Sequence, residues 1–83
     1  MKIYDYGGRK NVCGERVREQ RLRMRLSQTD LAARLQLAGV TIERDSLSRV
    51  EIGTRFVADY ELMTLADVLG VRVEWLLGMT KKI

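Results

Sequence analysis

The chain has 83 residues, of which 46% are apolar and 31% are charged, and its formal net charge is +4. A chain of this length has room for one small core, so we expect a single domain. Histidine is absent and Cys13 is the only cysteine. This composition excludes zinc fingers, Cys/His nucleophiles and an internal disulfide. We therefore expect no enzyme, no catalytic residues, no metal and no cofactor.

The charge is unevenly distributed along the chain. Residues 1–25 carry eight Lys or Arg against three Asp or Glu, whereas residues 26–83 carry seven against eight. A basic N-terminal third favours a polyanionic partner, although a solvated charged helix face would look similar. No apolar run is long enough to cross a bilayer, and residues 1–8 lack the features of a signal peptide. We expect a cytoplasmic, nucleoid-associated protein without a membrane partner.

The first ten residues show no periodic pattern and contain two glycines, so we predict a flexible or extended arm over residues 1–10. A helix follows, with Asn11 as a suitable N-cap. Its inward face is marked at spacings of three and four by Cys13, Val17, Arg21 and Met24. Arg21 is the anomaly, because a charged side chain within an apolar stripe needs a carboxylate partner or a route to solvent.

A second helix is predicted to begin at Ser27, because Asp30 three residues later completes the pattern of a capping box. Its inward face is formed by Leu31, Ala32 and Leu35. Gly39 ends this helix. The β-branched stretch 40–42 then leads into a third helix, and we expect Ile42 in the core.

Residues 44–52 have the pattern of a short amphipathic helix that Gly53 ends. Its apolar residues and Glu51 fall on one face, whereas the opposite face is polar. Glu51 is the counterpart of Arg21, so we predict a buried ion pair between the first and third helices. A short rod with donors and acceptors on its outer face fits a DNA major groove, although most amphipathic helices simply expose their polar face to water.

The last third of the chain predicts two more helices. One begins near Asp59 and is followed by Gly70, and the other is brief and ends at Gly78. Five short helices around one core, without proline or strand alternation, make an all-α domain. We place this domain at residues 11–79, followed by a basic tail at 80–83.

Five segments are informative when they are taken together. They are Ser27-Gln28, Leu31-Ala32, Leu47-Ser48-Arg49-Val50-Glu51-Ile52-Gly53, Leu65-Ala66-Asp67-Val68-Leu69-Gly70-Val71 and Val73-Glu74-Trp75-Leu76-Leu77. In this order they resemble the Cro/C1-type helix-turn-helix family, in particular the N-terminal domains of lambdoid phage repressors. The resemblance implies a five-helix, lambda-repressor-like DNA-binding domain whose helix-turn-helix is formed by the second and third helices.

The resemblance also implies roles for individual residues. The family's inter-helix arginine and glutamate fall on Arg21 and Glu51. The base-reading positions are Arg44, Asp45, Ser46 and Arg49, to which we add the outward-facing Ser48. The family's phosphate-contacting glutamine falls on Gln28, and Thr54-Arg55 would lie along the DNA backbone. Further candidate phosphate ligands are Ser27, Thr29, Arg9 and Lys10.

The chain departs from the family pattern in three ways. More residues separate Leu35 from Leu47 than in the compact motif, which predicts an extended connection in place of the tight turn. The caps of the last three helices lack the usual Ser or Thr and are Glu43, Ala58 and Arg72. Arg25 replaces the glycine common after the first helix, at a cost on the order of 1 kcal/mol if the residue is left-handed.

Two classes of function remain. The favoured one is a sequence-specific transcriptional regulator, most simply a repressor, that binds double-stranded DNA as a homodimer. The alternative is a helical protein-interaction module, or an antitoxin-like regulator, that uses the same fold to bind a protein partner. The polar outer face of the third helix favours DNA, because an apolar patch there would favour protein. Asp45 counts against DNA, since it repels phosphates unless it accepts from a cytosine amino group.

Overall fold

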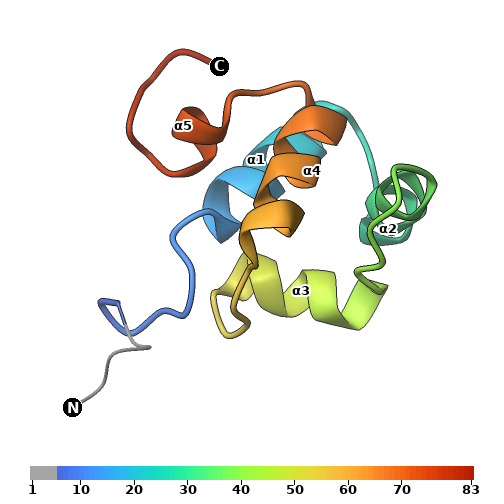
Figure 1. The fold of residues 1–83 in the computed structure, drawn as a ribbon, viewed down its shortest axis with the longest axis horizontal. Helices are drawn as coiled ribbons and strands as arrows, with labels where there is room; N and C mark the ends of the chain where they lie inside the picture. The colour runs from blue at the N-terminus through green and yellow to red at the C-terminus, as the bar shows by residue number, and fades with distance from the viewer. Residues whose placement is uncertain (1–5) are drawn as a thin grey trace.

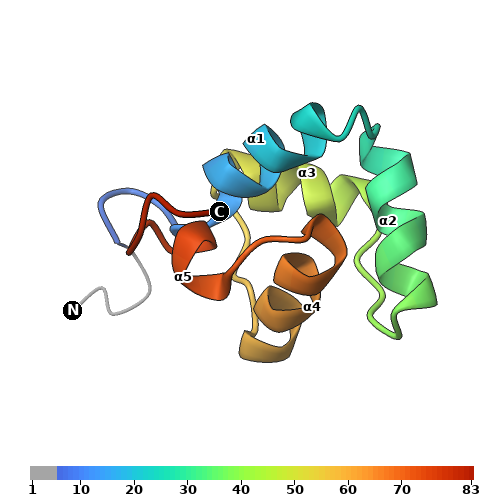
Figure 2. The same ribbon diagram turned by 90° about the horizontal axis from the view of Figure 1, so that it is seen from above.

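The computed structural model of the protein describes residues 6–83. Five helices follow one another: α1 (Gly14–Arg23), α2 (Gln28–Leu37), α3 (Arg44–Ile52), α4 (Asp59–Leu69) and α5 (Val73–Leu76). In this part of the chain the only strand-like feature is an isolated bridge between Tyr6 and Arg9, so the prediction of an all-α fold is confirmed. The helices α2 and α5 lie at opposite ends of the long axis (Figures 1 and 2).

One core joins the five helices. The helix α1 packs against α3, α4 and α5, and α2 packs against α3 and α4. Every helix contributes buried apolar side chains, and the largest of these are Val17, Leu31, Leu35, Leu47, Val50, Leu65, Leu69, Trp75 and Leu76. Ile42, in the connection between α2 and α3, is also buried, as predicted. The connection is therefore held to the core although it is long.

The helix starts differ in how they are capped. The capping box of α2 is confirmed, because the Ser27 hydroxyl accepts from the N–H of Asp30 and the Asp30 carboxylate accepts from the N–H of Ser27. These hydrogen bonds, the one from the Ser27 backbone first, hold the pKa of Asp30 below its ordinary value. By contrast, the N-cap residues of α3 and α5, Glu43 and Arg72, make no side-chain cap hydrogen bond, so the prediction of weak caps is confirmed there.

All five helices end in the same way, with two backbone hydrogen bonds that reach back over the last turn. After α1, the N–H of Leu26 donates to Arg21 O at 3.1 Å, and the N–H of Arg25 donates to Leu22 O at 3.0 Å. This arrangement needs a left-handed residue, which is a glycine after the other four helices: Gly39, Gly53, Gly70 and Gly78. After α1 the left-handed residue is Arg25, with φ of 58°. The condition under which Arg25 would carry an energy cost, a left-handed conformation, is thus met.

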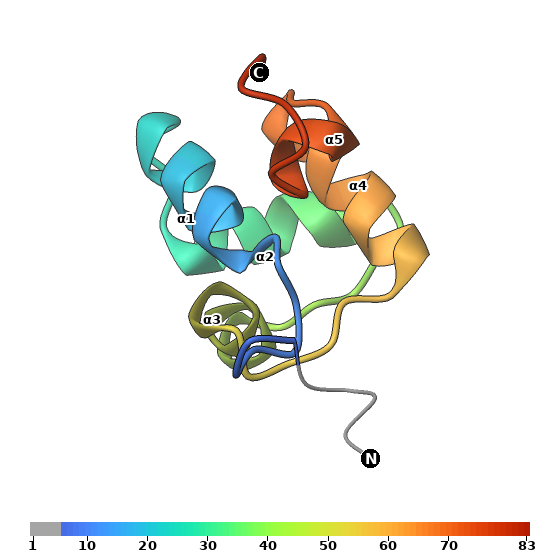
Figure 3. The same ribbon diagram turned by 90° about the vertical axis from the view of Figure 1, so that its left-hand side faces the viewer.

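Residues 6–10 correct the prediction of a flexible or extended arm. They form a turn closed by backbone hydrogen bonds between Tyr6 and Arg9 of 2.8 and 3.0 Å, and the N–H of Lys10 donates to Gly53 O at 2.8 Å. The turn is docked at the end of α3 (Figure 3). Sequence reasoning missed it because its partner lies more than forty residues away. The part of the predicted arm at residues 1–5 lies outside the described residues.

The start of α1 is a second correction. The helix begins at Gly14, and the N-cap position is Cys13 rather than Asn11. Asn11 still contributes, because its Oδ1 accepts from the N–H of Gly14 at 2.8 Å. The Cys13 side chain is buried, which raises the pKa of its thiol to about 11. The thiol therefore stays protonated at neutral pH, and Cys13 lies on the inward face as predicted, with a weak hydrogen bond from its Sγ to Asn11 Oδ1.

No helix within residues 6–83 has both the length and the apolar character that crossing a bilayer would require.

Candidate nucleic-acid interface

The outer face of α3 carries the five predicted base-reading side chains. Arg44, Asp45 and Arg49 are exposed, and Ser46 and Ser48 are partly exposed. The opposite face of α3 is buried through Leu47, Val50 and Glu51. Because α3 has only nine residues and is anchored along its inner side, its outer face forms a short ridge that is polar except for Ile52, which is 63% exposed.

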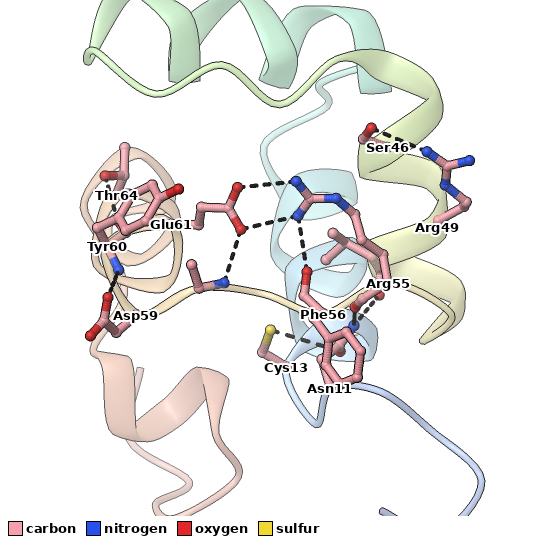
Figure 4. Close-up of polar contacts among 12 residues, drawn as sticks. Asn11, Cys13, Ser46, Arg49, Arg55, Phe56, Asp59, Tyr60, Glu61 and Thr64 are labelled. Atoms are coloured by element: carbon pink, nitrogen blue, oxygen red, sulfur yellow. Dashed lines mark hydrogen bonds and ion pairs between the residues drawn. The ribbon is translucent and has the colours of Figure 1, made fainter. Parts of the chain in front are cut away.

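The charged groups of this ridge are only loosely engaged with one another. Arg44 Nη1 lies 3.4 Å from Asp45 Oδ1, and the two side chains are 65% and 87% exposed. An ion pair so exposed contributes little, so both charges remain available to a ligand. Arg49 Nη2 donates to Ser46 Oγ at 3.3 Å, and Figure 4 shows the Arg49 side chain extending outward from α3 beside Ser46.

A buried ion pair fixes α3 from behind. Arg21 Nε lies 2.7 Å from Glu51 Oε2, and Arg21 Nη2 donates to Glu51 Oε1 at 3.0 Å, so the predicted pair is confirmed. These hydrogen bonds raise the pKa of Arg21, which therefore stays charged. Gln28 Nε2 also donates to Glu51 Oε1, at 3.1 Å. One carboxylate thus ties α3 both to α1 and to the start of α2.

At the start of α2, the three predicted phosphate ligands differ in what they can offer. Ser27 and Thr29 are exposed, but the Ser27 hydroxyl already caps Asp30. The Gln28 amide points to Glu51, so it acts first as a bridge between helices. The backbone N–H groups of Gln28 and Thr29 lie in the first turn, where the helix supplies no acceptors. These N–H groups, rather than the side chains, are the donors best suited to a phosphate.

Arg55 has a partner that sequence reasoning did not find. Its Nη1 and Nη2 lie 3.0 and 3.1 Å from the two carboxylate oxygens of Glu61, and Nη1 also donates to Phe56 O (Figure 4). Burial disfavours the charged form of Glu61, but the hydrogen bonds from Arg55 and from the N–H of Ala58 outweigh it and lower the pKa of Glu61. Arg55 is therefore a weaker candidate for a phosphate contact than its sequence position suggests, because its charge is already matched by Glu61 within the chain.

The two basic residues of the N-terminal turn also have intramolecular neighbours. Arg9 Nη1 lies 3.3 Å from Glu15 Oε1, and the Arg9 guanidinium covers Gly53, where an added Cβ would lie 2.7 Å from Arg9 Cζ. A cation at this place suits the negative end of the α3 dipole. The Lys10 ammonium lies 4.9 Å from the centre of the Phe56 ring but remains exposed. Lys10 is the more exposed of the two and is therefore better placed to meet a phosphate.

One exposed cation beside the interface was not assigned from the sequence. Arg25 is exposed and lies two residues before Ser27, the N-cap residue of α2. The Cα atoms of Arg25 and Ser27 are therefore within about 7.6 Å of each other. Four of the five helices use glycine at the equivalent left-handed position, and Arg25 replaces it. A residue kept in a strained conformation points to a use for its side chain. In the sequence, the absence of the usual glycine after the first helix is the feature that could have pointed to Arg25.

No protein-family model matches the chain, and no curated protein matches it in sequence. The similarity to lambdoid phage repressors therefore rests on the residues that carry it and stays a prediction. Within residues 6–83, no three side chains of the His, Cys, Asp and Glu types are grouped as a metal ion would need.

Proposed function

We propose that the protein is a sequence-specific DNA-binding transcriptional regulator, most simply a repressor, with a lambda-repressor-like fold. The observation that carries this proposal is the outer face of α3. It presents the exposed guanidinium groups of Arg44 and Arg49 on a short helix whose inner face is fixed through Glu51. A rigid helix with such donors is the element that a major groove accepts.

The side chains of the ridge divide into readers and supports. Arg49 lies in the middle of α3, where its planar guanidinium would donate to O6 and N7 of a guanine. Ser46 supports it, because the hydrogen bond between Ser46 Oγ and Arg49 Nη2 restricts the orientation of the guanidinium. Asp45 would accept from a cytosine amino group, which removes the objection that its charge repels phosphates.

The phosphate contacts would surround this ridge. The first-turn N–H groups of α2 and the Arg25 side chain would hold the phosphates of one DNA strand. The exposed Thr54 and Lys10 lie beside Gly53, at the C-terminal end of α3. Such contacts set the position and the salt dependence of binding but not its sequence preference.

The functional form would be a symmetric homodimer. A single domain of this size offers too few base contacts for the specificity of an operator, and a two-fold axis doubles them. We expect the segment from Trp75 to Met79 to contribute to the dimer, because Met79, which follows α5, is 73% exposed. The half-sites would then be separated by about one turn of DNA.

Selection of bound duplexes from a random pool tests this function. The full chain should enrich a palindrome, and the variant Arg44→Ala/Arg49→Ala, which leaves the buried face of α3 unchanged, should not enrich it. Enrichment of no sequence by the wild-type chain would contradict the proposal. That result would favour the alternative in which the fold binds a protein partner.

A further inference from the structure

We propose that Asn11 is a positioning residue of the DNA interface. Its side-chain amide would set where α3 ends relative to α1, and with it the angle at which the outer face of α3 meets the groove. This inference rests on the proposed function and adds to it a residue outside the helix-turn-helix.

The amide of Asn11 joins two points on either side of the end of α3. Asn11 Nδ2 donates to Val50 O at 3.1 Å and to Arg55 O at 2.8 Å. Val50 belongs to the last turn of α3, whereas Arg55 lies in the loop that leads to α4, beyond Gly53. One NH₂ group thus fixes both the end of the proposed reading helix and the direction of the chain that leaves it (Figure 4).

The other atoms of Asn11 are fixed as well. Its Oδ1 accepts from the N–H of Gly14, so the side chain cannot turn without losing a bond at the start of α1. Gly14 itself approaches α3 so closely that a Cβ at this position would overlap the carbonyl oxygen of Val50. The N–H of Lys10 adds a bond to Gly53 O. The start of α1 and the end of α3 are therefore held in one relative position.

Four hydrogen bonds converge on the Asn11 amide, the fourth being a long one of 3.8 Å from Cys13 Sγ to Asn11 Oδ1. They do more than stabilise the fold, because of where they act. The carbonyl group of Val50 belongs to the last turn of α3, directly after the base-reading residue Arg49, and the carbonyl group of Arg55 directly follows the exposed Thr54. Without the amide, the last turn of α3 and its loop would lose their shared anchor. Base contacts require accurate placement, so they should suffer before phosphate contacts do.

The chain contains a matched control for this argument. Gln20 Nε2 donates to Leu69 O at 3.1 Å, so a second side-chain amide from α1 satisfies a carbonyl in the last turn of another helix. Leu69 lies at the end of α4 far from α3 (Figure 1). Replacing Gln20 with alanine removes a similar contact at a place remote from the proposed interface.

The experiment compares Asn11→Ala with Gln20→Ala at a temperature at which circular dichroism shows both variants folded. Binding is measured on the duplex selected by the wild-type chain and on a random duplex of equal length. We expect Asn11→Ala to lower the ratio of specific to random affinity at least about fivefold, the effect of one poorly read base pair. Random binding should stay within about twofold of the wild-type value. Gln20→Ala should leave the ratio unchanged.

A second readout needs no DNA. The backbone amide signals of residues 49–55 should shift in Asn11→Ala and stay in place in Gln20→Ala. If Asn11→Ala does not fold, the same comparison can be made with Asn11→Ser. The serine hydroxyl keeps an oxygen near the N–H of Gly14, but the side chain is too short to bridge the carbonyl groups of Val50 and Arg55.

Equal ratios for the wild-type chain and the Asn11 variant would overturn the inference and leave the proposed function intact. If the wild-type chain itself prefers no sequence, the proposed function fails. In that case, unmoved amide signals in Asn11→Ala would show separately that Asn11 does not position α3.

Discussion

Arg21 and Glu51, thirty residues apart in the sequence, form a two-bond ion pair in which the side chains are only 8% and 3% exposed. Either single substitution to alanine leaves the other charge buried without its partner. We expect each to lower the free energy of unfolding by about 3 to 5 kcal/mol, as measured by denaturant titration. A loss below about 1 kcal/mol would mean that solvent reaches the remaining charge. The double variant Arg21→Met/Glu51→Leu, which removes both charges, should lose much less than the sum of the two single variants.

The second prediction concerns the acid stability that Glu61 contributes. The pKa of Glu61 is lowered in the folded chain, so its contribution is complete above the ordinary glutamate pKa of about 4.3 and is lost as the pH falls through the lower folded pKa. The difference in unfolding free energy between the wild type and Glu61→Gln should therefore be constant from about pH 6 to 8 and shrink below about pH 4. A difference that grew on acidification would show that the folded pKa is raised instead.

The third prediction is a stabilising change at the start of α4. Half of a capping box is already present, because the Glu61 carboxylate accepts from the N–H of Ala58 at 2.9 Å. Ala58 offers no side-chain acceptor in return, although its backbone is extended as a cap requires. Ala58→Thr should complete the box and stabilise the fold by about 0.5 to 2 kcal/mol, seen as a higher Tm. An unchanged Tm would indicate that Asp59, which accepts from the N–H of Tyr60, already supplies the cap.

The sequence predicted the local features of the fold well. The stops at Gly39, Gly53 and Gly70 and the capping box at Ser27 depend on residues within one turn of each other, so their spacing is visible in the sequence. The ion pair of Arg21 was also predictable, because each charge interrupts an apolar stripe.

The contacts that the sequence did not reveal are of a different kind. Asn11 bonds to carbonyl groups 39 and 44 residues away, and backbone carbonyls carry no mark in a sequence. Arg55 lies in a loop outside any helical pattern, so nothing in the sequence paired it with Glu61, which lies on the buried face of α4. The candidate site was therefore predicted on its outer face but not in the contacts that hold it.

The fourth prediction separates stability from binding at Arg25. Arg25→Gly removes the strain of a left-handed arginine and should raise stability by about 1 kcal/mol. It also removes a proposed phosphate contact, so the slope of log affinity against log salt should fall by about 0.9 per protomer. Arg25→Ala should show the same fall in the slope of log affinity against log salt, but it should not gain stability. A salt slope equal to the wild-type value in both variants would remove Arg25 from the interface.

The central claim is that α3 reads bases, and Arg49→Ala tests it most directly. Affinity should be measured on the selected palindrome and on a random duplex at the same salt concentration. We expect the binding free energy of the variant on the palindrome to weaken by about 1 to 3 kcal/mol. The variant should also lose its sequence preference at one base pair in each half-site, whereas its binding to the random duplex should be almost unchanged. Equal weakening on both duplexes would contradict the account, because Arg49 would then be touching phosphate rather than a base.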